Sequence, residues 1–257
     1  MPGERTIPDG LHVIAHEPED PTAPRVVLVH GAMDRSTSFA KVARRLADLR
    51  VVRYDRRGYG HSRALGVGDL DTHVADLLAV VGEEPAVVVG HSMGGTLALI
   101  AASRRPGSIR SVMAYESPLP WIPAYTDDTG DQPMFQLSGD PANAAERFMR
   151  HMVGSSRWER LPARTRADRR AEGPALVADI TAMRTSKMLI DLRSLAMPVL
   201  AVHGSAASDR HRRATEYLAE HVPGGELHVI EGSDHGAHLT HADAFAALVR
   251  RTVERAV

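Results

Sequence analysis

The chain has 257 residues, of which 43% are hydrophobic and 25% are charged, and its formal net charge is −1. This composition is typical of one globular domain with room for an inserted subdomain, and so balanced a charge gives no reason to expect nucleic acid or a membrane as partner. The chain has no cysteine, which excludes disulfides, cysteine nucleophiles and thiolate metal sites.

The N-terminal region offers no targeting segment. Its first ten residues contain no apolar run, and no later stretch reaches the length of about 18 apolar residues that a membrane span needs. We therefore expect no secretory signal, no membrane span and a cytoplasmic location. A mature chain that has lost its signal would fit the same sequence.

The apolar pattern predicts strands that alternate with helices along most of the chain. Strands are expected at 11–16, 25–31, 51–54, 87–89, 111–115, 197–204 and 226–231. Helices are expected around 39–46, 74–81, 93–103, 214–218 and 245–253. Several strands are nearly continuous apolar runs, which is typical of parallel strands buried on both faces. The predicted fold class is therefore α/β, with a mostly parallel, doubly wound sheet.

The alternation stops between 118 and 192, where we predict a helical cap inserted into a core domain formed by 1–117 and 193–257. Residues 117–192 hold five of the 11 aromatic residues and five of the ten methionines. Since α/β sheets bind ligands beyond the carboxyl ends of their strands, these side chains are candidates for an apolar pocket. The alternative is that they pack onto the core. The candidates are Trp121, Tyr125, Met134, Phe135, Phe148, Met149, Met152 and Trp158.

A serine lies between glycines where the central strand passes into a helix. Three valines precede the pentapeptide Gly90-His91-Ser92-Met93-Gly94, and an alanine- and leucine-rich helix follows it. We expect a turn so tight that no Cβ fits at Gly90 or Gly94. The glycine spacing excludes a dinucleotide-binding loop, and the absence of a following Lys-Ser or Lys-Thr excludes a P-loop.

This pentapeptide resembles the G-x-S-x-G nucleophile elbow of the α/β-hydrolase superfamily. The resemblance implies an α/β-hydrolase fold in which Ser92 is the nucleophile. His235 follows the last predicted strand in a glycine-containing loop, at the place of the family's catalytic histidine. His30-Gly31-Ala32 resembles the family's H-G-x motif, which implies an oxyanion hole made by the backbone N–H groups of Ala32 and Met93.

A second motif, at 55–62, resembles the family's D-x-R-G-x-G-x-S turn. We interpret it as architectural, with glycines for the turn and charged residues paired beneath it, and a substrate-binding role is the alternative. The arginine-rich stretch at 157–172 predicts a solvated helical face, with an anion-steering rim as the alternative.

The acid of the triad is the one member whose position the motifs leave open. The family's G-x-x-D pattern would place an aspartate at Ala207, which has no carboxylate. Glu116 ends the strand after the elbow helix, from which some α/β-hydrolases take the acid, and it is the preferred candidate. Asp209 is the alternative, although Ser208 before it predicts that it lies in the first turn of a helix.

These residues predict a serine hydrolase that cleaves a carboxylic ester, lactone or thioester through an acyl-enzyme. A perhydrolase, haloperoxidase or C–C hydrolase could use the same triad, and a non-catalytic ligand-binding protein is the competing class. We expect a small acyl substrate with an apolar portion and no cofactor. We also expect no metal, since His235, His238 and His241 lack the H-E-x-x-H arrangement. Oligomeric state and substrate identity are not predicted.

Overall fold

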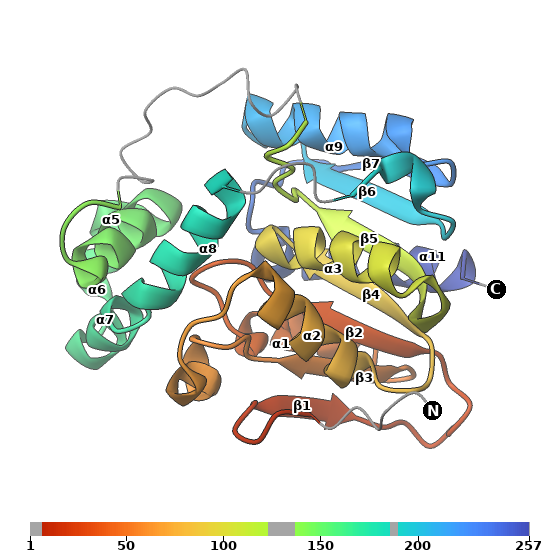
Figure 1. Cartoon of the computed structure of the whole chain (residues 1–257), viewed down its shortest axis with the longest axis horizontal. Helices are drawn as coiled ribbons and strands as arrows, with labels where there is room; N and C mark the ends of the chain where they lie inside the picture. The colour runs from red at the N-terminus through yellow and green to blue at the C-terminus, as the bar shows by residue number, and fades with distance from the viewer. Residues whose placement is uncertain (1–6, 123–136, 186–189, 257) are drawn as a thin grey trace.

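The computed structural model describes residues 7–122, 137–185 and 190–256. Within these ranges, seven strands form one sheet in the order β1-β3-β2-β4-β5-β6-β7 (Figure 1). The strands are β1 (Val13–His16), β2 (Arg25–Val29), β3 (Arg50–Tyr54), β4 (Ala86–His91), β5 (Ile109–Tyr115), β6 (Val199–Gly204) and β7 (Gly225–Ile230). All neighbours pair in parallel except β1, which runs antiparallel to β3. The predicted mostly parallel sheet is confirmed.

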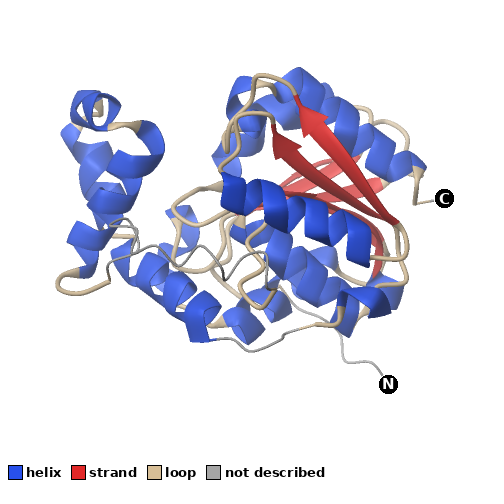
Figure 2. Ribbon diagram, turned by 90° about the horizontal axis from the view of Figure 1, so that it is seen from above, coloured by secondary structure: helices blue, strands red, loops and turns tan. Residues whose placement is uncertain are grey.

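Helices cover both faces of the sheet (Figure 2). One face packs against α2 (Leu70–Val81), α3 (Met93–Arg104) and α9 (Asp209–His221), and the other against α1 (Ala40–Arg45) and α11 (Ala242–Glu254). Shorter helices are η1 (Ser36–Phe39), η2 (Gly60–Leu65), η3 (Pro106–Ser108), η5 (Leu192–Ser194) and α10 (Ala237–Thr240).

The central strand β4 shows why the sequence forms this sheet. Val88 packs on the face covered by α2 and α3, whereas Val87 and Val89 pack on the face covered by α1 and α11. Side chains alternate along a strand, so a strand covered on both faces has to be apolar at every position. The valine run therefore places β4 in the middle of the sheet, and its carboxyl end carries the Gly-x-Ser-x-Gly turn.

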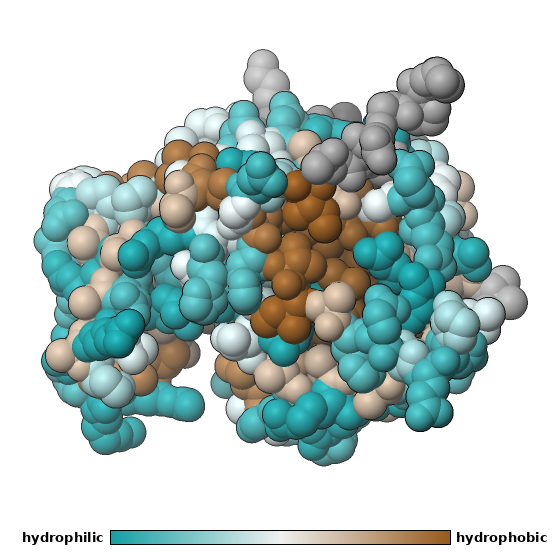
Figure 3. All heavy atoms as spheres, turned by 90° about the horizontal axis from the view of Figure 1, so that it is seen from below, coloured by the Kyte–Doolittle hydropathy of each residue, from teal (hydrophilic) through white to brown (hydrophobic). Residues whose placement is uncertain are grey.

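A helical insertion lies between β5 and β6. Its described helices are α5 (Pro141–Val153), α6 (Ser155–Arg160), α7 (Ala163–Arg170) and α8 (Gly173–Thr185). Two buried carboxylates of the insertion bind arginines of the core, Asp179 with Arg56 at 2.7 Å and Glu172 with Arg35 at 2.7 Å. In the space-filling view the insertion forms a lobe set off by a notch, and hydrophobic residues gather near the centre of this face (Figure 3).

The aromatic and methionine side chains of the insertion divide between two environments. Phe148, Met149 and Trp158 are buried in one cluster with Met33 and Tyr59 of the core. These three therefore join the insertion to the core, as the packing alternative predicted. Met152 is exposed and Trp121 half-buried, while Tyr125, Met134 and Phe135 lie outside the described residues.

None of the helices in the described part of the chain combines the length and the apolar character that a membrane span requires.

Candidate active site

The turn at Ser92 is as tight as the glycines predicted. A Cβ on Gly90 would lie 2.3 Å from the Cα of Gly95, and one on Gly94 would lie 2.1 Å from the carbonyl oxygen of Val29. Ser92 itself has φ 53° and ψ −126°, a conformation that costs a non-glycine residue about 1–3 kcal/mol. Strain of this kind at the carboxyl end of a central strand is typical of a functional residue.

The predicted oxyanion loop packs directly on this turn. A Cβ on Gly31 would lie 2.9 Å from the Cβ of Ser92, so the backbone that leads to Ala32 contacts the serine. His30 holds the loop in place. Its Nδ1–H donates to Gly31 O at 2.7 Å, and its Nε2 accepts from the backbone N–H of Arg56 at 2.8 Å.

The same contacts set the charge of His30. Burial and the nearby Arg56 guanidinium lower the pKa of His30 to about 4, so its imidazole is neutral near pH 7. On the other side of Ser92, Met93 is the first residue of α3, whose N–H has no acceptor within the helix.

Glu116 lies at the end of the strand beside the elbow. The pairing of His91 with Tyr115 aligns the ends of β4 and β5, and the Ser92 N–H donates to Tyr115 O at 2.8 Å. The Glu116 side chain is fully buried. Its Oε2 accepts from His235 Nδ1 at 2.6 Å, and its Oε1 accepts from the Gly204 N–H at 3.0 Å.

These hydrogen bonds keep Glu116 ionised in spite of its burial. Burial alone would raise the pKa of this carboxyl, but the hydrogen bond and charge of His235, together with His211 and the Gly204 N–H, hold it below its usual value. A buried carboxylate that accepts from His235 Nδ1 leaves Nε2 without a proton, which is the form a general base requires.

Backbone contacts fix the His235 loop against β4 and β5. The Tyr115 hydroxyl donates to the carbonyl oxygen of Asp234, and Nε2–H of His91 donates to the carbonyl oxygen of His235 at 2.8 Å. The Asp234 carboxylate accepts from the Gly236 N–H at 2.9 Å. The Asp234 side chain therefore caps the turn that it begins. His91, the residue just before Ser92, binds the backbone of His235.

Asp209 is placed away from His235. It is the first residue of α9, where the Ser208 side chain caps the helix, and its carboxylate pairs with Arg212 at 3.0 Å. Its side chain is 78% exposed. The structure thus brings Glu116, rather than Asp209, to His235.

His211, which no sequence motif indicated, also contacts this pair. Its ring stacks on that of His235 with centroids 4.6 Å apart and planes 9° apart, and its Nδ1 lies 3.5 Å from Glu116 Oε2. Burial and the proximity of His235 lower the pKa of His211 to about 3. No motif marks this residue, because its position depends on how α9 packs beside the loop after β7.

Residues 26–248 match the alpha/beta hydrolase family. The chain belongs to this family. The pimeloyl-[acyl-carrier protein] methyl ester esterase of Neisseria meningitidis is 29% identical over 240 residues, which cover 90% of this chain and 93% of the relative.

Solved structures agree on the alpha/beta hydrolase fold. An esterase from Thermogutta terrifontis superposes with a TM-score of 0.76 at 19% identity, covering 98% of this chain and 97% of its own. An enol-lactonase from Burkholderia xenovorans superposes with a TM-score of 0.71 at 20% identity, covering 95% and 96%. The predicted superfamily and fold are confirmed.

The turn at 55–62 joins parts of this alpha/beta hydrolase through buried charges. The Asp55 carboxylate accepts from the N–H groups of Ser36 and His61, both at 2.8 Å. Arg56 binds Asp179 of the insertion, and Arg57 binds Asp76 of α2 at 2.9 Å. These contacts agree with an architectural interpretation of the motif.

The three histidines of the last loop do not share one site. His235 binds Glu116, whereas His238 Nε2 lies 3.3 Å from Asp34 Oδ2. His241 is half-buried, and its Nδ1 lies 2.9 Å from Thr240 Oγ1. His235, His238 and His241 are spaced three residues apart in the sequence, but their side chains therefore lie in three different environments.

Proposed function

We propose that this protein is a serine hydrolase of carboxylic esters, with Ser92 as nucleophile, His235 as general base and Glu116 as the acid that orients His235. The observation that carries the proposal is the 2.6 Å contact between Glu116 and His235 beside the strained serine turn. The family's usual acid position holds Ala207, which has no carboxylate, and Glu116 supplies one from the neighbouring strand.

The reaction follows from these positions. Ser92 Oγ attacks the acyl carbon while His235 Nε2 takes its proton, and the buried charge of Glu116 stabilises the imidazolium. The N–H groups of Ala32 and Met93 donate to the oxyanion. His235 then protonates the leaving alcohol, and water attacks the acyl-enzyme to release the acid. These steps use only groups of the chain, the substrate and water, so the proposal includes no cofactor.

The substrate class rests on the nucleophile and on the relatives. A serine at the elbow forms an acyl-enzyme, whereas epoxide hydrolysis and dehalogenation need an alkyl ester on a carboxylate. The relative from N. meningitidis is named for a methyl ester of an acyl group. We infer a small or medium acyl ester with an apolar portion, and lactones and thioesters belong to the same reaction class.

Labelling with a fluorophosphonate probe tests the nucleophile. The wild-type chain should be labelled once, and Ser92→Ala should lose both the label and ester hydrolysis, the latter by about 10⁶-fold in kcat. Ser103→Ala changes a serine at the other end of α3 and should leave both unchanged. An unlabelled wild-type chain would support the non-catalytic binding protein instead. A panel of p-nitrophenyl esters of graded length then defines the acyl preference.

A further inference from the structure

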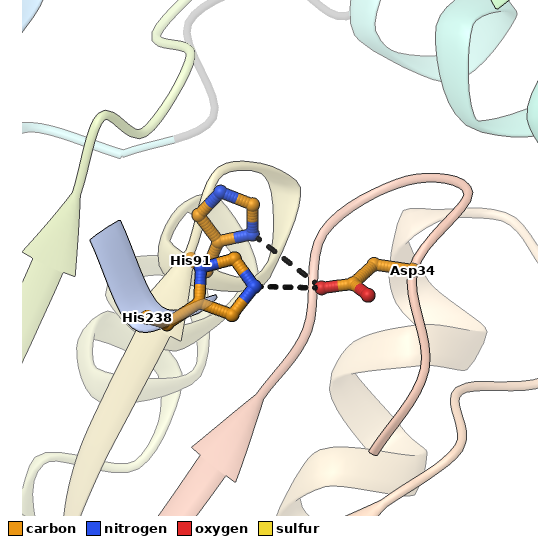
Figure 4. Close-up of side chains that lie close together, drawn as sticks. All are labelled: Asp34, His91 and His238. Atoms are coloured by element: carbon orange, nitrogen blue, oxygen red, sulfur yellow. Dashed lines mark ion pairs between the residues drawn. The ribbon is translucent and has the colours of Figure 1, made fainter. Parts of the chain in front are cut away.

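A second cluster of polar side chains lies beneath the proposed site. Asp34 comes from the loop after β2, His91 ends β4, and His238 lies in α10 (Figure 4). Asp34 Oδ2 lies 3.3 Å from His238 Nε2 and 3.8 Å from His91 Nδ1. The three atoms all lie within 4.8 Å of one another, although 57 residues separate Asp34 from His91 in the chain.

The two imidazoles have nitrogens that the protein leaves unpaired. His91 donates its Nε2–H to the carbonyl oxygen of His235, so its Nδ1 carries a lone pair that faces Asp34. Within the described residues, His91 Nδ1 and His238 Nδ1 have no hydrogen-bond partner, and His238 Nε2 faces Asp34 Oδ2 at 3.3 Å without an aligned hydrogen bond. Both side chains are more than nine-tenths buried. Buried polar atoms normally have a hydrogen-bonding or metal partner, so these nitrogens indicate a partner such as a bound ion.

The donor set of the cluster suits a cation. Asp34 supplies a carboxylate, and His91 and His238 supply imidazoles. Carboxylates and imidazoles bind metals through the lone pairs of their deprotonated oxygen and nitrogen atoms.

We propose that Asp34, His91 and His238 form a binding site for a divalent transition-metal cation of the Zn²⁺ type. Two imidazole nitrogens and one carboxylate oxygen suit Zn²⁺ or Co²⁺, whereas Mg²⁺ and Ca²⁺ require mainly oxygen ligands. Ligand atoms at about 2.0–2.1 Å from a tetrahedral ion lie about 3.3 Å apart. The separations of 3.3 and 3.8 Å from Asp34 Oδ2 are close to this value, and the two imidazole nitrogens lie within 4.8 Å of each other, so a bound ion would draw the side chains together.

The surroundings of the cluster match those of a metal site. Metal-binding histidines usually donate their second N–H to a carbonyl oxygen, as His91 does to His235. Ligating carboxylates are usually hydrogen-bonded in turn, as Asp34 is by Ser38 Oγ at 2.9 Å. A bound ion would hold His91, and with it both the serine turn and the backbone of His235.

Glu116, His211 and His235 form another group with metal-binding atoms close together. Here the partners already satisfy one another. Glu116 Oε2 and His235 Nδ1 lie 2.6 Å apart, and His211 Nδ1 lies 3.1 Å from Ser208 Oγ. The unpaired nitrogens thus favour the cluster at Asp34.

Calorimetry tests the site when untagged, metal-stripped protein is titrated with Zn²⁺ alone. In a separate titration, the visible absorption of Co²⁺ shows whether the site is tetrahedral. We expect one ion per chain and no comparable binding of Mg²⁺. Loss of a supporting group alone weakens metal affinity by about 10–100-fold. His238→Gln and Asp34→Asn remove a ligand and should weaken Zn²⁺ binding by at least about 100-fold. His211→Gln alters the other group and should leave it unchanged.

Two results would overturn the proposal. One is a wild-type chain that binds no Zn²⁺. The other is binding that survives in His238→Gln and Asp34→Asn but is lost in His211→Gln, which would place the ion at Glu116 and His235. Circular dichroism shows whether each variant is folded, and Asp34→Asn decides the outcome if His238→Gln fails to fold. These readouts are independent of ester hydrolysis.

Discussion

Replacing Glu116 by glutamine should lower kcat for ester hydrolysis by about 10⁴-fold, which corresponds to about 5.5 kcal/mol in the barrier. The glutamine side chain has the shape of the glutamate but only one accepting oxygen. The Gly204 N–H, 3.0 Å from Oε1, can only donate, so it selects the amide oxygen. The amide NH₂ then faces His235 Nδ1, where the carboxylate oxygen had been at 2.6 Å.

This exchange reverses the hydrogen bond to His235. An NH₂ group needs an acceptor, so Nδ1 loses its proton and Nε2 carries it. A protonated Nε2 cannot take the proton of Ser92, and the rate falls although the fold persists. If the amide turns the other way, the buried Gly204 N–H is left unpaired at a cost of about 1–3 kcal/mol.

Steady-state hydrolysis of a p-nitrophenyl ester measures the effect, with circular dichroism to verify folding. Asp209→Asn is the matched control, because it also removes one carboxylate charge but at an exposed position paired with Arg212. It should stay within about twofold of the wild-type kcat, since exposed ion pairs contribute little. A Glu116→Gln enzyme that keeps more than a tenth of the wild-type kcat would refute the reasoning.

Three further changes test the fold and its charges. Gly94→Ala should destabilise the chain by about 3 kcal/mol or more, because the added Cβ would lie 2.1 Å from Val29 O. Asp179→Asn should cost about 3–5 kcal/mol in unfolding free energy, because it leaves the buried Arg56 guanidinium without its counter-charge. His211→Gln should make the free energy of unfolding depend less steeply on pH. The slope between about pH 6 and pH 4 should fall by up to about 1.4 kcal/mol per pH unit. An unfolded histidine takes up a proton below about pH 6.5, whereas folded His211 resists protonation to about pH 3, so acid favours unfolding.

Urea denaturation measures all three, each with its own control. Gly107→Ala adds a methyl group where nothing lies within 4 Å, so equal losses at both glycines would contradict the steric argument. Asp209→Asn should change stability by less than about 1 kcal/mol, and a similar loss in Asp179→Asn would show that burial of the pair is unimportant. His151→Gln removes an exposed histidine of α5 and is the matched control for the loss of an imidazole. An unchanged pH slope in His211→Gln would contradict the lowered pKa of His211.

Local pattern determined much of this protein. Runs such as Val87-Val88-Val89 predict a strand covered on both faces, and the same run is buried in β4 between two layers of helices. Gly90 and Gly94 predict a turn without room for a Cβ, and in the structure a Cβ at either position would overlap backbone atoms. Such features depend on backbone sterics and on the periodicity of burial, both of which act between residues close together in the chain.

Tertiary structure decided which carboxylate reaches His235. Glu116 and His235 are 119 residues apart, and only the order of β4, β5, β6 and β7 in the sheet brings them together. Asp209 lies nearer in sequence but is the first residue of a helix with its side chain in solvent. The pairing of β2 with β4 likewise brings Asp34 beside His91, and α10 adds His238 from a third segment. No local pattern encodes such contacts, because they depend on the register of neighbouring strands rather than on any one segment.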